Sequence, residues 1–270
     1  MIFTHVLSRA AIALTVVVSG LAATAPAFAD VSDLDRKICA DRNEDADKKI
    51  AACTVVLGYP SERALHANAY HQRGLAFYRK QKLDFAIADY TEAIKLDPKF
   101  VFAYGARALA YNQKGDTEHA LQDADEGLRL APQFFEMRML RGLSHRNAKA
   151  WDLAIADYSE AIKLKPNMSS GYLARGDIYR DKGDVAAALA DYDTAFKLSP
   201  GTVDPYRHRA LLFFQRNEVD KAIADFDVVL RMDPRDAASY AARSYLHKQK
   251  GDAARAAADL EQARKLGWTK

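Results

Sequence analysis

The sequence lacks most features that mark an enzyme or a nucleic-acid-binding protein. It has no G-x-S-x-G nucleophile motif, no H-E-x-x-H zinc motif and no glycine-rich phosphate loop. Its formal net charge is only +3, and its basic and acidic residues are interspersed, unlike the concentrated basic face that a phosphate backbone requires. We therefore expect no catalytic site, no bound cofactor or metal, and no nucleic-acid partner.

Cysteine is scarce, since the 270 residues include only Cys39 and Cys53. The pair has neither C-x-x-C redox spacing nor a C-x-x-C-H haem attachment site, and without nearby histidines it makes a poor zinc site. In an exported protein an even pair of this kind predicts a structural disulfide. It would enclose 13 intervening residues, and the chain-entropy model gives about 3 kcal/mol of stabilisation for such a loop.

The first 29 residues differ in character from the rest of the chain. Arg9 supplies a positive charge, an apolar stretch runs from Ala10 to Val18, and small residues end at Ala29. This pattern is typical of a cleaved secretory signal peptide. A transmembrane anchor is the alternative, but the polar residues, glycine and proline from Ser19 to Pro26 leave the apolar run short of the roughly 20 residues that span a bilayer. We therefore expect residues 1–29 to be removed, leaving a periplasmic or secreted bacterial protein without a membrane span.

A strict repeat occupies most of the remaining chain. An arginine recurs every 34 residues and an aspartate follows each one by sixteen positions: Arg73 and Asp89, Arg107 and Asp123, Arg141 and Asp157, Arg175 and Asp191, Arg209 and Asp225, Arg243 and Asp259. One uninterrupted period predicts a single structural unit repeated six times, at residues 67–100, 101–134, 135–168, 169–202, 203–236 and 237–270. Each unit has two apolar stripes of helical spacing, and a proline closes five of the six units.

Small residues stand at two positions of every unit. The eighth position is glycine, alanine or serine, and the twentieth is always alanine. Two antiparallel helices can approach closely at such positions, and the rings of Tyr90, Tyr158 and Tyr192 can fill the space beside them. A single hairpin would leave an apolar flank uncovered, so we expect the hairpins to stack in an array.

This spacing of aromatic, small and proline residues resembles the tetratricopeptide repeat, over six units that make up 204 of the 270 residues. The resemblance implies an all-α, right-handed superhelical solenoid of six hairpins, with a concave groove lined mainly by the first helices. It also implies a non-catalytic scaffold that binds a peptide or protein segment in that groove.

The two ends of the array carry separate expectations. Residues 30–66 contain a stretch that resembles a degenerate seventh unit, with Ile50 to Cys53 aligned on a second helix. We expect a capping hairpin there, held together by the disulfide between Cys39 and Cys53. The helix expected at residues 253–265 carries many alanines and has no cap after it, so we expect it to fray.

The repeated arginines and aspartates lie beside packed positions of their helices, where charges need partners. The favoured interpretation is a repeated structural ion pair, and the alternative is a track of arginines that captures an acidic ligand. The register stays open, because Arg107 can pair with Asp123 of its own unit or with Asp89 of the preceding one.

Groove residues in the resembled family lie on the first helix, mainly at the second, fifth, ninth, twelfth and thirteenth positions. These positions hold a mixed set of residues in the present chain, from which we take nine as candidate partner-binding residues: His71, Tyr78, Asn112, Met139, Arg146, Arg180, Arg207, Phe214 and Tyr245. Some family members clamp a terminal carboxylate with lysine and asparagine. This chain has His71 and Leu75 at those places, so we expect no such clamp.

The third unit departs most from the others. Arg138 replaces the tyrosine found at the fourth position elsewhere, and the segment from Phe134 to Met139 holds two aromatic residues and two methionines. Such side chains suit an adaptable binding surface, although they could instead repack a bend between units.

The sequence thus predicts an exported protein-interaction scaffold. Two other hypotheses remain open at this point. One is an accessory of envelope biogenesis that holds secreted clients or a polysaccharide-export component. The other is an enzyme or cofactor carrier, which the missing motifs disfavour.

Overall fold

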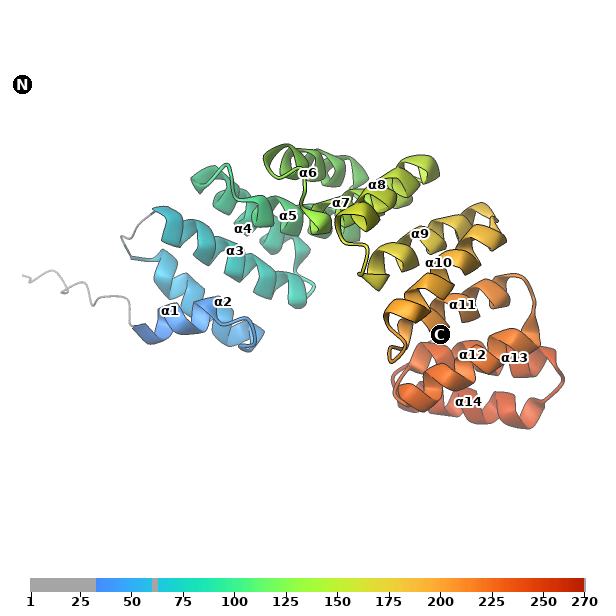
Figure 1. Cartoon of the computed structure of the whole chain (residues 1–270). Coiled ribbons are helices and arrows are strands. Elements are labelled where there is room, and N and C mark those ends of the chain that lie inside the picture. The colour runs from blue at the N-terminus through green and yellow to red at the C-terminus, as the bar shows by residue number, and fades with distance from the viewer. Residues whose placement is uncertain (1–32, 60–62, 270) are drawn as a thin grey trace, which may run out of the picture.

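The computed structural model describes residues 33–59 and 63–269, so the expected signal peptide lies outside the described residues. All secondary structure in the described part is α-helical. Fourteen helices pair as hairpins that follow one another along a curved solenoid, from α1 at the blue end to α14 at the red end (Figure 1). The predicted all-α array of helical hairpins is confirmed.

Helices α1 and α2 form the hairpin that precedes the repeat units, and from α3 onward odd-numbered helices are first helices and even-numbered ones are second helices. Their bounds are α1 (Asp33–Ala40), α2 (Ala46–Leu57), α3 (Arg63–Arg79), α4 (Leu83–Leu96), α5 (Val101–Lys114), α6 (Thr117–Leu130), α7 (Phe135–Asn147), α8 (Trp151–Leu164), α9 (Ser169–Lys182), α10 (Val185–Leu198), α11 (Asp204–Gln215), α12 (Val219–Met232), α13 (Ala237–Gln249) and α14 (Ala253–Lys265). Because α3 begins at Arg63, the last residues of the segment 30–66 belong to a helix of the first unit.

The hairpin turns use a left-handed backbone conformation. Gly115, Gly183 and Gly251 follow the first helices of the second, fourth and sixth units with φ of 81°, 82° and 78°. Glycine adopts this conformation at no steric cost, so it ends a helix readily. The other three units place Gln81, Lys149 and Asn217 at the same position with φ between 57° and 59°.

A glycine of the first helix faces a tyrosine ring of the second helix in three of the units. A Cβ added at Gly74, Gly142 or Gly176 would lie 2.6–2.7 Å from a ring carbon of Tyr90, Tyr158 or Tyr192, respectively. These rings are buried. No side chain fits at that separation, so the tyrosine at the twenty-fourth position requires glycine at the eighth. Units without this tyrosine carry alanine or serine there.

The N-terminal hairpin is joined by a disulfide between Cys39 on α1 and Cys53 on α2, with Cα atoms 4.8 Å apart. Both cysteines are buried in a small core with Val56 and with Ala69 of α3. The hairpin therefore covers the flank of the first unit, as a capping unit of an array should. Lys49 is also buried in this hairpin, and burial lowers its pKa. Its ammonium donates to Gln72 Oε1 at 3.3 Å.

Candidate functional site: the groove of the first helices

The repeated arginines and aspartates pair within their own unit. In five units the arginine Nε and Nη2 donate to the two carboxylate oxygens of the aspartate sixteen residues later, at 2.7–2.9 Å, as between Arg73 and Asp89. The six aspartates are buried. This series of pairs, called here the arginine–aspartate ladder, holds the second helix of each hairpin against the first, with the bidentate geometry that charge-assisted pairs favour.

The same arginines also reach the preceding unit. Nη1 of Arg107 donates to Thr91 Oγ1 at 2.9 Å, and Nη1 of Arg175 donates to Ser159 Oγ at 3.0 Å. Arg141 and Arg243 contact Asp125 and Asp227 in the same way. One guanidinium therefore joins three helices of two consecutive units, so its partners are structural. The ladder does not offer a free track of cations to an acidic ligand.

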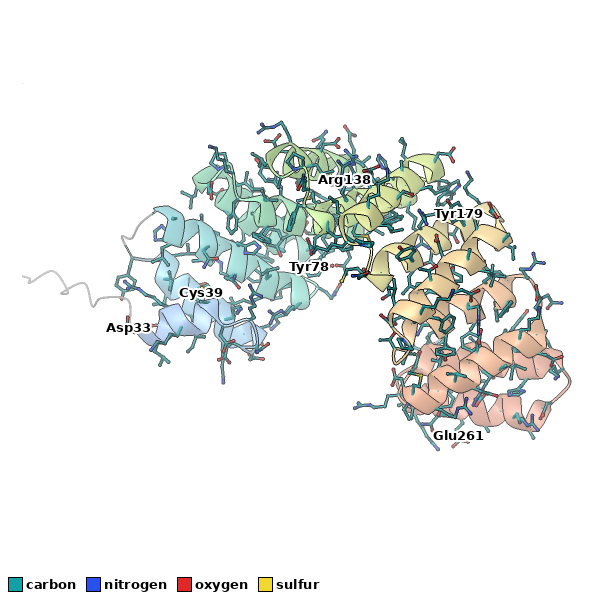
Figure 2. All side chains as sticks on the ribbon, in the orientation of Figure 1. Asp33, Cys39, Tyr78, Arg138, Tyr179 and Glu261 are labelled. Carbon is teal, nitrogen blue, oxygen red and sulfur yellow. A yellow bond between two sulfur atoms is a disulfide. The ribbon has the colours of Figure 1, made fainter. Side chains whose placement is uncertain are left out.

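The third unit adds partners to its ladder aspartate. Asp157 accepts from Nε and Nη2 of Arg141, and it also lies 3.5 Å from Arg138 Nη1 and 3.0 Å from His145 Nδ1. The hydrogen bonds that Arg141 donates to Asp157 raise the pKa of Arg141 above its ordinary value. Arg138 and His145, the unusual residues of this unit, thus contact a buried carboxylate. Figure 2 labels Arg138 near the outer rim of the array and Tyr78 on its inner side.

A second set of ion pairs was missed in the sequence. Lysines at the fourteenth position contact aspartates at the eighteenth position of the preceding unit, as in Lys114 with Asp84, Lys182 with Asp152, and Lys250 with Asp220. The signal was present but weaker than that of the ladder, since these pairs recur every 68 residues, in alternate units. The aspartates are exposed, so each pair contributes at most about 1 kcal/mol.

The face of the first helices opposite the arginine–aspartate ladder contains two neighbouring hollows. The first has a volume of about 430 Å³ and is lined by residues of α5 and α7 together with the residue before α7: Phe102, Gly105, Ala106, Leu109, Phe134, Glu136, Met137 and Leu140. We call it the apolar hollow. In Figure 1 helix α6 lies outside α5 and α7, so these two helices face the inner side of the curve.

The second hollow has a volume of about 490 Å³ and is more polar. Its lining comes from α7, α8, α9 and α11: Glu136, Met139, Leu140, Leu143, Arg146, Tyr158, Ser170, Leu173, Ala174, Asp177, Asp204 and His208. We call it the polar hollow. Because Glu136 and Leu140 line both hollows, the two form one trough across the second to fifth units.

Buried charge forms the wall of the polar hollow. Asp177 is 6% exposed and accepts hydrogen bonds from Tyr192 Oη at 2.9 Å and Arg180 Nη1 at 2.9 Å. His208 Nδ1 lies 2.8 Å from the same carboxylate and Arg146 Nη1 lies 3.6 Å from it. Burial alone would raise the pKa of Asp177, but these cationic and hydroxyl partners lower it on balance. The carboxylate therefore stays ionised and fixes its neighbours.

Three of the nine predicted groove residues are turned away from solvent. His71 is 9% exposed, and its ring packs against those of Tyr90 and Phe100. Asn112 is also buried, and its Nδ2 donates to Ser144 Oγ at 2.8 Å. The Arg180 side chain is 7% exposed and pairs with carboxylates of its own helix. These three side chains are held inside the array and offer little surface to a partner.

The other six candidates keep accessible surface. Met139 and Arg146 line the polar hollow. Phe214 and Tyr245 lie farther along the array with ring centroids 5.5 Å apart, and Tyr245 is 53% exposed. Arg207 is half-buried and pairs with Asp204 and Asp236, and Tyr78 is half-buried on α3.

The unusual segment of the third unit has a mixed outcome. Phe135 and Met137 are buried, Met137 against Gly127 of α6, so part of the segment repacks the junction between units. Phe134 and Met139 line the hollows. The sequence did not single out Leu140 or Ala106 as groove residues, because nothing in their type distinguishes a hollow floor from ordinary helix packing. Gly105 stands at the fifth position, but it was not selected because it has no side chain to contact a partner.

Within residues 33–59 and 63–269, no group of histidine, cysteine and carboxylate side chains is placed to hold a metal ion. None of the helices in this part of the chain is both long and apolar enough for a bilayer crossing.

Comparison with known proteins identifies the repeat. Profiles of the tetratricopeptide repeat match residues 67–100, 106–169 and 176–247. No curated protein sequence matches the chain.

Solved structures share the fold at low sequence identity. A tetratricopeptide repeat protein from Parabacteroides merdae superposes with a TM-score of 0.73 at 22% identity, covering 84% of this chain and 88% of its own. PilW, a type IV pilus biogenesis factor, gives 0.64 at 19% identity over 74% of this chain and 92% of its own. Pseudomonas aeruginosa pilF gives 0.60 at 20% identity over 76% and 93%. Such identities show the fold alone.

Proposed function

The chain belongs to the tetratricopeptide repeat family, and we propose that it is a non-catalytic scaffold that binds a segment of another protein along its groove. The observation that carries the proposal is the trough made by the apolar and polar hollows, which share Glu136 and Leu140. Together they offer apolar surface, fixed charges and a length of several repeat units to one extended or helical guest.

The groove is formed before any guest arrives. The arginine–aspartate ladder fixes each hairpin, and the Asp177 carboxylate fixes Arg180, Tyr192 and His208 along the wall. A receptor ordered in this way loses little conformational entropy on binding, so modest contacts give useful affinity.

The compartment is part of the proposal. The buried disulfide between Cys39 and Cys53 supports an oxidising location, because disulfides persist in the periplasm and outside the cell. The signal-like segment at residues 1–29 supports export. We place the scaffold in the periplasm or outside the cell.

A photocrosslinking experiment in intact cells tests the function. A benzophenone amino acid replaces Leu143, which lines the polar hollow, or Leu153, which is 55% exposed on the second helix α8. We expect one or two discrete protein adducts from position 143 and none from position 153. Equal adducts from both positions would contradict a groove-specific scaffold, and a broad smear from position 143 would indicate a holder of many unfolded clients.

A further inference from the structure

The apolar hollow gathers apolar residues in one concavity. Seven of its eight lining residues are apolar or glycine. Phe102 is 61% exposed and Leu109 is 37% exposed, although both are large hydrophobic residues. Exposed apolar surface gathered in a concavity marks a binding site more often than scattered single residues do.

The depth of this hollow depends on Gly105, which has no side chain, and on the flexible side chain of Met137. Gly105 lies on its floor, where an added Cβ would come 3.3 Å from Met137 Cε. Met137 is itself 1% exposed, and its unbranched thioether can adjust to the shape above it. Phe102 and Phe134 form the rim, edge to face with centroids 5.4 Å apart. The volume of about 430 Å³ lies in the ordinary range for binding pockets, about 300–1,000 Å³.

A single ionisable side chain, that of Glu136, lines the hollow. Its carboxylate accepts from Lys165 Nζ at 2.8 Å, and both side chains are about half exposed. Although burial acts to raise the pKa of Glu136, the hydrogen bond from Lys165 lowers it on balance, so the group is ionised at neutral pH. An exposed pair of this kind is weak, so a cation of a guest can share or replace the lysine.

We propose that the apolar hollow receives a bulky apolar side chain of the bound segment and that Glu136 favours a lysine or arginine next to it. The inference rests on the proposed function and makes the guest more specific: a segment with an aromatic or long aliphatic residue flanked by a cation. The hollow supplies the apolar contact, and the carboxylate at its edge supplies the complementary charge.

Three methionines of the chain serve as NMR reporters for a binding test. Methyl-labelled methionine reports on the apolar hollow through Met137, on the polar hollow through Met139, and on α12, away from both, through Met232. The probes are acetyl-Phe-Arg-amide, acetyl-Phe-Glu-amide and acetyl-Ala-Arg-amide, titrated while methyl resonances are recorded by NMR. We expect the Phe-Arg probe to shift Met137 saturably and to leave Met232 unmoved.

The charge requirement is measured with the same probes. We expect the Phe-Glu probe to bind about two- to fivefold more weakly than Phe-Arg, the range that an exposed ion pair gives. Glu136→Gln should abolish that difference and retain the Phe requirement. Equal binding of the Phe-Arg and Phe-Glu probes to the unmodified protein would overturn the role of Glu136, and binding of Ala-Arg as strong as Phe-Arg would overturn the apolar anchor.

Two phenylalanines of nearly equal exposure give a matched control. Phe102 is 61% exposed at the rim, and Phe85 is 60% exposed on α4, which lines neither hollow. We expect Phe102→Ala to abolish the Met137 shift and Phe85→Ala to leave it intact. Loss in both variants, or in neither, would overturn the proposal.

The test separates this inference from the proposed function. Groove adducts at position 143 without any Met137 shift would leave the scaffold standing and refute the anchor. If benzyl alcohol binds as tightly as the Phe-Arg probe, the hollow takes a small apolar molecule and gains nothing from the peptide or its cation, which refutes the proposed peptide specificity.

Discussion

The two faces of the first helices differ in how much their residues vary from unit to unit. On one face, the ladder arginine at the seventh position has nearly the same geometry in five of the six units, with Nη2 2.8 Å from the aspartate in both the first and the last unit. On the other face, the fifth position holds a different residue in every unit, namely His71, Gly105, Met139, Leu173, Arg207 and Ala241. Contacts that join the two helices of a hairpin therefore tolerate little change, whereas the groove varies because the backbone beneath it is already fixed.

The largest effect is expected from removing a ladder carboxylate. Asp157→Ala leaves Arg141, Arg138 and His145 facing a buried site without their anion, and we expect a loss of about 3–5 kcal/mol in unfolding free energy. Urea denaturation measures it. Asp125→Ala is the matched control, because Asp125 contacts the same Arg141 but its side chain is 62% exposed.

We expect the control to cost less than about 1 kcal/mol, as exposed pairs do. Equal losses for the two variants would show that the ladder is a row of solvated surface pairs.

The next effect concerns His71, a predicted groove residue whose side chain is buried. Burial first, and then the nearby charge of Lys49, lower the pKa of His71 to about 4. Between that value and the unfolded value of about 6.5, the unfolded chain binds a proton that the folded chain does not. Stability should therefore fall as pH drops through this window, by up to about 3 kcal/mol from His71 alone.

His71→Leu should flatten the pH dependence in that window, because the variant has no imidazole to protonate. Comparing the two proteins by urea denaturation at several pH values cancels the titration of their shared carboxylates. If both lose stability equally from pH 6.5 to 4, the imidazole is accessible to protons in the folded array and position five is an open groove position there.

A smaller loss should come from the glycine that faces a tyrosine. Gly142→Ala places a methyl 2.6 Å from Tyr158 Cε1, so the ring or the helix must shift. We expect a cost of about 1–3 kcal/mol, typical of overpacking. Gly201→Ala is the control, because nothing lies within 4 Å of a Cβ built there.

Thermal melts of both variants check this expectation, and the control should stay within about 0.5 kcal/mol of the parent protein. If Gly142→Ala proved neutral, the pairing of glycine with tyrosine at these positions would need an explanation other than close approach.

The smallest effect on stability is expected on the open groove. Tyr245 is 53% exposed and contacts Phe214. Truncating it to alanine should cost less than about 1 kcal/mol, the value of one aromatic contact at a surface. Differential scanning calorimetry measures the change. A loss as large as that of Asp157→Ala would mean that the groove face is as important for stability as the ladder face.

Much of the fold could be predicted from periodicity, and less of the groove. Position within a 34-residue unit states which face of a helix a residue occupies, and this was enough to predict the hairpins. It does not state what lies opposite. Asn112 donates its hydrogen bond to Ser144 of the next unit, and Arg180 pairs with Asp177 and Asp181 of its own helix. Position in the repeat reveals neither contact.

Local spacing was enough to predict the hairpin, its repetition in six units and the cysteine pair, because the spacing recurs from unit to unit and the chain offers a single pair of cysteines. The ladder partner of each arginine, the groove side chains that face inward and the places where a hollow opens were set by packing between helices. Those outcomes depend on the space between units, and a missing side chain such as that of Gly105 becomes a cavity only when residues of another helix stand around it.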